Sequence, residues 1–202
     1  DVRKLAGTLI VDVDNTIQNA GVTKARQKLA ETSLKYLNQL AGDAGDAALF
    51  KELAEGFSHV GNVQYYPGSA HLGDPTGALA SYTTARSLAE RWVKDQPGSI
   101  DAQAQLAAIL VMLGEAQVAL NLHDEALQTF ASALTMYESM AAADPAMWRW
   151  PRNVGLVIDK SANVWRRKGD GEKALAGFTE AMKTYNDVAK RFPNEPKLQR
   201  DI

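Results

Sequence analysis

The sequence has no cysteine among its 202 residues, which excludes disulfide bonds, thiolate metal sites and cysteine nucleophiles. It also has no run of about 18 apolar residues, the length that a membrane-spanning helix requires. No basic stretch followed by an apolar stretch and a small-residue cleavage site marks a signal peptide. We therefore expect no membrane insertion by this segment. Because the sequence starts at Asp1 and not at methionine, we also expect it to be part of a longer protein.

Charge is unevenly distributed along the chain. Residues 1–145 carry 10 Lys/Arg and 17 Asp/Glu, a net of −7, whereas residues 146–202 carry 12 and 7, a net of +5. A basic end can attract an acidic partner. The alternative is that these charged residues lie on solvated helix surfaces and are simply distributed unevenly along the chain.

Three segments align at a spacing of 48 residues without insertion or deletion, which indicates a structural repeat. The aligned positions are a turn residue, two alanines seven residues apart with an aromatic between them, a large apolar residue and a proline. In chain order they are Gly73, Asn121 and Gly169; Ala78, Ala126 and Ala174; Tyr82, Phe130 and Phe178; Ala85, Ala133 and Ala181; Trp92, Met140 and Val188; and Pro97, Pro145 and Pro193.

Each aligned position has a physical explanation. Glycine and asparagine adopt the left-handed backbone conformation at low cost, so the first position predicts a helix stop and a tight turn. The alanines share one helical face with the aromatic, where small residues allow a neighbouring helix to approach. Proline disfavours the helix before it and predicts the end of each second helix.

The segments between these second helices also have helical spacing, over residues 47–65, 104–114 and 153–168, and earlier over 5–17 and 29–40. We expect an all-α fold of about eight helices in four antiparallel pairs, forming one repeat domain over residues 1–202. Its parts are a divergent first pair (1–43), repeats at about 46–97, 98–145 and 146–193, and the start of a further helix at 196–202. Residues 67–72 form a longer loop in the second pair.

These positions resemble the tetratricopeptide repeat family, in which Leu-Gly, an aromatic, Gly-Asp, Ala, an aromatic, Ala and Pro recur. The match is carried by residues such as Leu113-Gly114, Gly169-Asp170 and Phe178. The resemblance implies a right-handed α-α superhelix that binds proteins or peptides. The family period is about 34 residues, so a period of 48 implies longer helices.

Residues 5–100 also look like the C-terminal tetratricopeptide array of some bacterial serine/threonine kinases, in phrases such as Glu52-Leu53-Ala54-Glu55-Gly56-Phe57. No kinase motif, such as a glycine-rich loop, His-Arg-Asp or Asp-Phe-Gly, occurs in this sequence. We therefore expect this segment to be a non-enzymatic interaction module, with any kinase domain outside it.

In the resembling family, ligands lie in a groove lined by the first helix of each pair. The resemblance assigns this groove to Lys51, Glu55, Val111, Glu115, Val118, Asp159, Asn163, Arg166 and Arg167. The family's clamp for peptide carboxylates needs Lys and Asn at fixed positions. Asn163 matches one of them, but Asp159 stands where lysine is expected, so we predict no such clamp.

Trp148 and Trp150 alternate with arginines between two prolines. Aromatic residues interleaved with Arg are typical of interface hot spots and of single-strand stacking platforms. The favoured alternative is that the pair simply fills the junction between the third and fourth helix pairs. The net negative charge of the chain argues against nucleic acid as the partner.

The segment Leu9–Ile17, with Asp12 and Asp14, resembles the first motif of haloacid-dehalogenase-type phosphatases. That chemistry needs a strand in an α/β sheet, whereas Leu5, Leu9, Val13 and Ile17 favour a helix. His59, His71 and His123 show no metal-ligand spacing, and we expect no cofactor or metal. We predict a protein-binding module, with homodimerisation as the alternative and phosphatase activity as a remote one.

Overall fold

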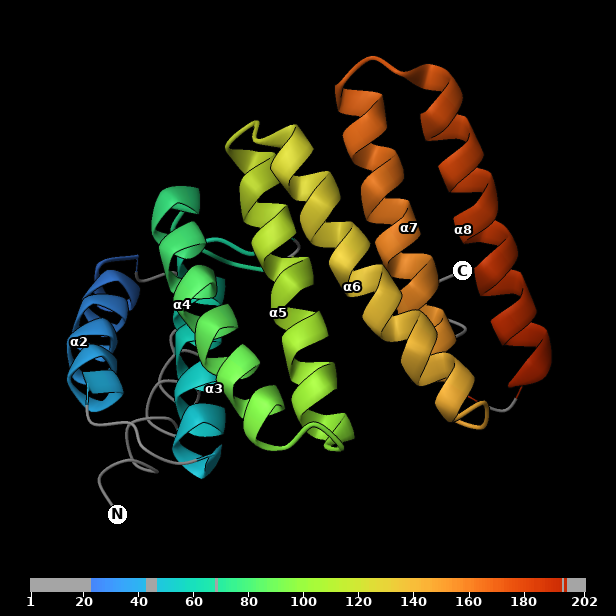
Figure 1. Ribbon diagram of the computed structural model, residues 1–202. Coiled ribbons are helices and arrows are strands. Elements are labelled where there is room, and N and C mark those ends of the chain that lie inside the picture. The colour runs from blue at the N-terminus through green and yellow to red at the C-terminus, as the bar shows by residue number, and fades with distance from the viewer. Residues whose placement is uncertain (1–22, 43–46, 68, 194, 196–202) are drawn as a thin grey trace. The chain divides into compact units, whose positions relative to one another are not determined.

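The computed structural model describes residues 23–42, 47–67, 69–193 and 195, and over these residues the protein is all-helical (Figure 1). The helices of the described part are α2 (Thr23–Gly42), α3 (Ala47–Gln64), α4 (Pro75–Asp95), α5 (Ile100–Ala119), α6 (His123–Ala143), α7 (Arg149–Arg167) and α8 (Gly171–Arg191). The predicted all-α repeat of paired helices is confirmed. The predicted helix over residues 5–17, the motif at Asp12 and Asp14, and the start of a helix at 196–202 lie outside the described residues.

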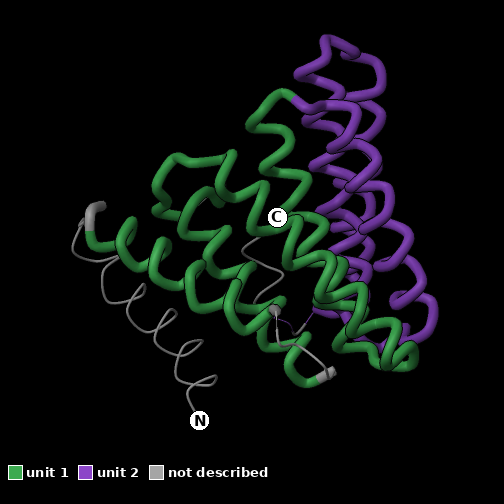
Figure 2. The backbone as a smooth tube through the Cα atoms, turned by 60° about the vertical axis from the view of Figure 1, so that its left-hand side comes forward, with its two compact units in different colours: residues 1–121 green, residues 122–202 purple. Residues whose placement is uncertain are grey.

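The chain forms two compact units, residues 1–121 and 122–202 (Figure 2). In the first unit α3 packs against both α2 and α4, and α4 also packs against α5. In the second unit α7 packs against both α6 and α8. Each predicted repeat contains two helices, and the repeat 98–145 is divided between the two units at Asn121.

The turn before each second helix has the predicted backbone conformation. Gly73, Asn121 and Gly169 have φ angles of 75°, 61° and 82°. These values lie in the left-handed region, which glycine and asparagine adopt most readily. The prediction made from the 48-residue spacing is therefore confirmed at all three turns.

The helix ends also follow from local sequence. Asp74 and Asp170 each cap a second helix, accepting hydrogen bonds from the backbone N–H of Gly77 (2.8 Å) and Lys173 (3.0 Å). Helices α4, α6 and α8 each end two residues before a proline of the aligned set. Proline lacks the amide hydrogen that a further helical turn would need.

The core of the first unit is built around Tyr82, which is fully buried with Ala78 of α4 and with Leu113 and Ala116 of α5. Gly61 of α3 allows this close approach, because a Cβ atom there would lie only 2.5 Å from the Tyr82 ring. The small residues of the repeat thus make room for the aromatic between the helices.

In the second unit, α6 buries the same aligned face as α4, including Phe130 and Tyr137. Burial raises the pKa of Tyr137 to about 12, although a hydrogen bond with Asn153 of α7 acts in the opposite direction. At the C-terminal end of α8, the Arg191 guanidinium donates a hydrogen bond to the carbonyl oxygen of Pro145 (2.7 Å). These contacts join α6 to α7, and α8 to the loop that follows α6.

Helix α5 is long and apolar enough to cross a membrane by length and composition, with a mean hydropathy of 1.3 over its most apolar window. More than half of that window, 56%, is buried inside the protein. A buried core helix has the same composition, since both environments exclude water.

Candidate protein-binding site

Helix α7 carries a row of polar side chains that includes four residues of the predicted groove. Asn163 donates a hydrogen bond from its side-chain amide to the carbonyl oxygen of Asp159 (3.2 Å). Arg166 in turn donates to the side-chain oxygen of Asn163 (3.3 Å). Asp159 and Asn163 are half-buried, whereas Arg166 and Arg167 are exposed. The structure thus brings these predicted residues together on α7, with two guanidinium groups at its C-terminal end.

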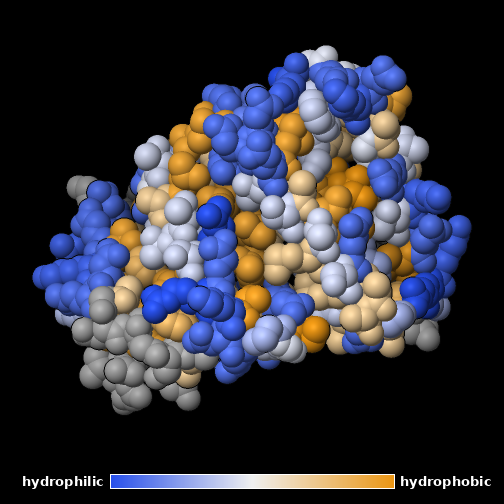
Figure 3. Space-filling model, in the orientation of Figure 1, coloured by the Kyte–Doolittle hydropathy of each residue, from blue (hydrophilic) through white to orange (hydrophobic). Residues whose placement is uncertain are grey.

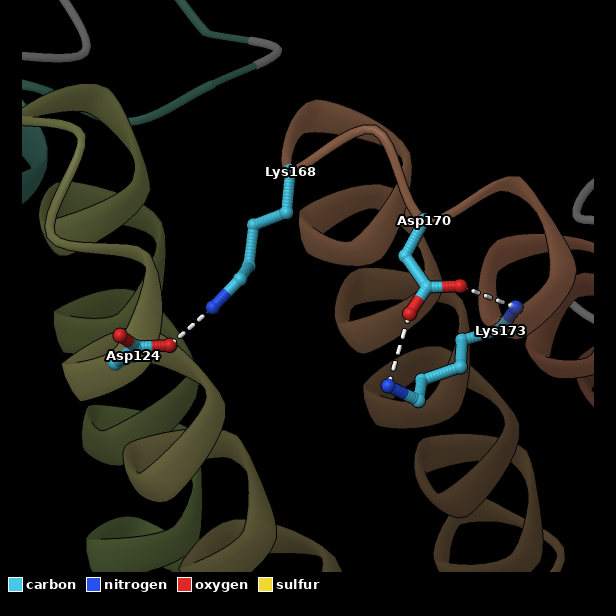
Figure 4. Close-up of polar contacts among 4 residues, drawn as sticks. All are labelled: Asp124, Lys168, Asp170 and Lys173. Carbon is cyan, nitrogen blue, oxygen red and sulfur yellow. Dashed lines mark hydrogen bonds and ion pairs between the residues drawn. The ribbon is translucent and has the colours of Figure 1, made fainter.

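Two ion pairs lie beside this end of α7 (Figure 4). Lys168, which follows α7, reaches the carboxylate of Asp124 at the start of α6. Lys173 of α8 pairs with the capping carboxylate of Asp170 at 2.8 Å. The hydrogen bond from Lys168 holds the pKa of Asp124 below its ordinary value, and the hydrogen bond from Lys173 does the same for the pKa of Asp170.

Trp165 completes the cluster at the end of α7. The ammonium groups of Lys173 and Lys168 lie 4.3 Å and 5.3 Å from the centre of its ring, within the range of cation–π attraction. Both lysines therefore have anionic and aromatic partners within the chain. Hydrophilic side chains gather over this end of the second unit, where α7 leads into α8 (Figure 3).

The predicted groove residues of the first unit lie on α3 and α5 in less open surroundings. Val111 and Val118 of α5 are buried, each at 9% exposure, and Glu55 and Glu115 are half-buried. Lys51 is exposed, with its ammonium 5.5 Å from the centre of the Trp92 ring of α4. Of these five residues, Lys51 is the one whose side chain is largely open to solvent.

Trp148 and Trp150 lie where the loop after α6 enters α7, and both are half-buried. The guanidinium of Arg149 lies 5.8 Å from the Trp148 ring centre, and Arg152 donates a hydrogen bond to Asn153 (3.2 Å). This half-buried position is compatible with both uses predicted for the pair, as a junction filler and as part of an interface.

The described residues place no group of three or more His, Asp or Glu side chains where they could hold a metal ion. His71 is engaged locally, since its Nδ1 accepts a hydrogen bond from the backbone N–H of Gly73 (2.9 Å) and its ring lies 4.7 Å from that of Tyr65. The pKa of Tyr82 is raised mainly by burial. The raised pKa of Tyr82 therefore has a structural cause in packing.

Sequence reasoning did not single out the cluster of Asp124, Lys168 and Lys173 around Trp165. One signal for part of it was available, because the Asp170 cap lies three residues before Lys173, within ion-pair distance on a first helical turn. Asp124 and Lys168 are separated by 44 residues. Their contact depends on how α6 and α7 pack, which no local pattern reports.

No protein-family model matches this chain, and no curated protein matches it either. Among solved structures, the chain is similar to the crystal structure of BtubC (BKLC) from P. vanneervenii, with 14% sequence identity and a TM-score of 0.38. The similarity covers 91% of this chain and 82% of that one.

Proposed function

We propose that this chain is a non-enzymatic protein-binding module, and that the C-terminal end of α7 binds an acidic segment of its partner. The observation that carries this proposal is the exposure of Arg166 and Arg167 beside a row of side chains already fixed by hydrogen bonds. Exposed guanidinium groups form paired hydrogen bonds with carboxylates more effectively than other cations do.

The surrounding charge supports an acidic partner. Lys168 and Lys173 are matched by Asp124 and Asp170, so the local ion pairs leave the two arginines as additional positive charge. Residues 146–202 carry a net charge of +5. A surplus of positive charge accelerates the encounter with a negatively charged partner and makes the binding affinity sensitive to salt.

The tetratricopeptide resemblance supports the same role, because first helices of that family present ligand-binding side chains and α7 is a first helix. It also leads us to propose that the module belongs to a larger signalling protein, such as a bacterial serine/threonine kinase. Helical repeats suit this work, since their small and aromatic residues are used for packing and leave the remaining helix surface for ligands.

The test compares the capture of partner proteins by the native chain, by Arg166→Glu/Arg167→Glu, and by a control with the same charge change. Lys28 and Lys35 of α2 are exposed, so Lys28→Glu/Lys35→Glu is a matched control. Binding of each captured protein is then measured by fluorescence anisotropy at low and at physiological salt. A labelled polyglutamate peptide serves as a defined acidic probe.

We expect the arginine variant to bind the partner about 10-fold more weakly, because two exposed attractions become repulsions of similar size. The control should stay within about 2-fold of the native chain, the effect of long-range charge at physiological salt. Equal losses in both variants would show that net charge alone governs binding, which would reject α7 as the site.

A further inference from the structure

Helix α8 exposes an apolar stripe formed by Leu175, Phe178, Met182 and Ala189, and Tyr185 adjoins it at the edge where its ring packs against Gly155 of α7. Their spacing places them along one side of the helix. Leu175 and Met182 are 69% and 65% exposed, and the other three are half-buried. Large apolar side chains that line up in this way commonly mark an interface.

The repeat shows how unusual this exposure is within the chain. The residues 48 positions before Phe178 and Tyr185 are Phe130 and Tyr137, which are 0% and 4% exposed. At the same aligned position as Phe178, Tyr82 of α4 is also 0% exposed. The positions of Phe178 and Tyr185 are therefore buried in both earlier second helices, whereas the positions of Leu175 and Met182 are half-buried there, at Leu127 and Leu134 of α6, and open to solvent on α8.

The structure also shows what covers this face in the earlier helices. Tyr82 of α4 packs between Gly61 of the preceding helix α3 and Leu113 and Ala116 of the following helix α5. Tyr137 of α6 is hydrogen-bonded to Asn153 of α7, again the following helix. The stripe on α8 is thus a surface of the type that a further helix covers in this chain.

We propose that α8 of a second copy covers the stripe, with the two α8 helices antiparallel around a two-fold axis at Met182. About such an axis, Leu175 of one copy faces Ala189 of the other, so a large side chain meets a small one at both ends. The two Met182 side chains meet at the centre. A two-fold interface uses the same surface on both copies, which this arrangement satisfies.

Charge beside the stripe favours the antiparallel arrangement. Glu172 and Lys190 lie on the same flank at opposite ends of α8, and both are exposed. Antiparallel helices bring Glu172 of each copy to within two residues of the level of Lys190 of the other, about 3 Å along the helix, whereas parallel helices would place each charge at the level of the same charge in the other copy. This self-complementarity is the reason to prefer a second copy over another helical partner. The proposal is independent of the role proposed for α7.

The first experiment measures the mass of the full chain by sedimentation equilibrium over a range of concentrations. We expect a reversible dimer, and Met182→Glu should weaken it at least about 100-fold, because two carboxylates would face each other in an apolar contact. The control is Ser132→Glu, at an exposed position of α6 that aligns with Glu180 of α8. It should dimerise like the native chain, and circular dichroism should show unchanged helix content in both.

The second experiment tests the geometry and uses the absence of native cysteine. Met182→Cys should form an intermolecular disulfide on mild oxidation, since the two positions adjoin the axis, whereas Ser132→Cys should not. Glu172→Lys and Lys190→Glu should each weaken the dimer, and the double variant should restore it. A monomer at every concentration would overturn the proposal and leave the stripe to a helix that follows α8 in the same protein or to a helix of another protein. A dimer that resists Met182→Glu, or fails to cross-link at residue 182, would overturn it equally.

Discussion

Replacing Gly61 by alanine should destabilise the first unit, although alanine is the better helix former. Gly61 lies in α3 against the ring of Tyr82, and an added Cβ atom would be 2.5 Å from Cε1 and 2.8 Å from Cδ1. The ring cannot move away easily. It is fully buried, and its hydroxyl lies 2.8 Å from Oδ1 of Asn62 and 3.1 Å from the carbonyl oxygen of Tyr65.

The magnitude follows from three opposing effects. Glycine to alanine inside a helix contributes about 1 kcal/mol of stability. Overpacking a close-packed core costs about 1–3 kcal/mol, and displacement of the hydroxyl costs about 1 kcal/mol more. We therefore expect Gly61→Ala to lower the free energy of unfolding by about 1–3 kcal/mol, the sum of these effects.

The assay is urea denaturation followed by circular dichroism, with Gly171→Ala as the control. Gly171 lies in α8, and a Cβ added there would meet no atom within 4 Å beyond its chain neighbours and the backbone of its own helix. Gly171→Ala should be neutral or stabilising. In a Tyr82→Leu background the clash is gone, so Gly61→Ala should there cost at least about 1 kcal/mol less, as a double-mutant cycle measures.

Two results would show that the Tyr82 ring does not require a glycine at position 61. The first is a Gly61→Ala protein as stable as the native chain. The second is additivity between the substitutions at residues 61 and 82, which would mean that the ring and the glycine do not constrain each other.

Further predictions concern titration and the backbone. The folded-state pKa of Asp124 lies below its unfolded value. The contribution of Asp124 to stability is therefore present above about pH 4 and is lost as the pH falls through the folded-state pKa. Lys168→Met should return the NMR titration midpoint of Asp124 toward 3.8. The pKa of Tyr137 is raised to about 12, so its contribution to stability is lost as the pH rises from 10 toward 12. Tyr137→Phe should remove the ionisation step near pH 12 from the absorbance titration at 295 nm. Gly169→Ala should cost about 1–2 kcal/mol on urea denaturation, because φ is 82° there. Ser99→Ala should cost about 1 kcal/mol in the same assay, since Ser99 Oγ accepts the capping bond of α5 from Ala102 N–H.

Much of the fold could be predicted because the relevant signals are local and repeated. The turn at Asn121 follows from its alignment with Gly73 and Gly169, and proline positions predict where the second helices end. These features depend on backbone preferences of single residues. The sequence also indicated that Tyr82 and Phe130 fill equivalent positions between helices.

The candidate site was harder to predict because it depends on how helices pack. A helical pattern placed Val111 and Val118 on the same side of α5 as Glu115, but it could not show that packing buries both valines. Asn163 and Arg166 were assigned to the groove by the family resemblance, and their hydrogen bond follows from a spacing of three residues on one helix. The contact of Lys168 with Asp124 joins two helices and has no local signature.

Site-specific photo-cross-linking tests directly whether the C-terminal part of α7 contacts a partner protein. The photo-reactive residue p-benzoylphenylalanine replaces Asp159 in one variant, which leaves Arg166 and Arg167 intact, and replaces the exposed Lys28 of α2 in the other. Each chain is irradiated with the captured partner. We expect a cross-linked partner from position 159 and little or none from position 28. Cross-linking from position 28 alone, or equally from both, would contradict it.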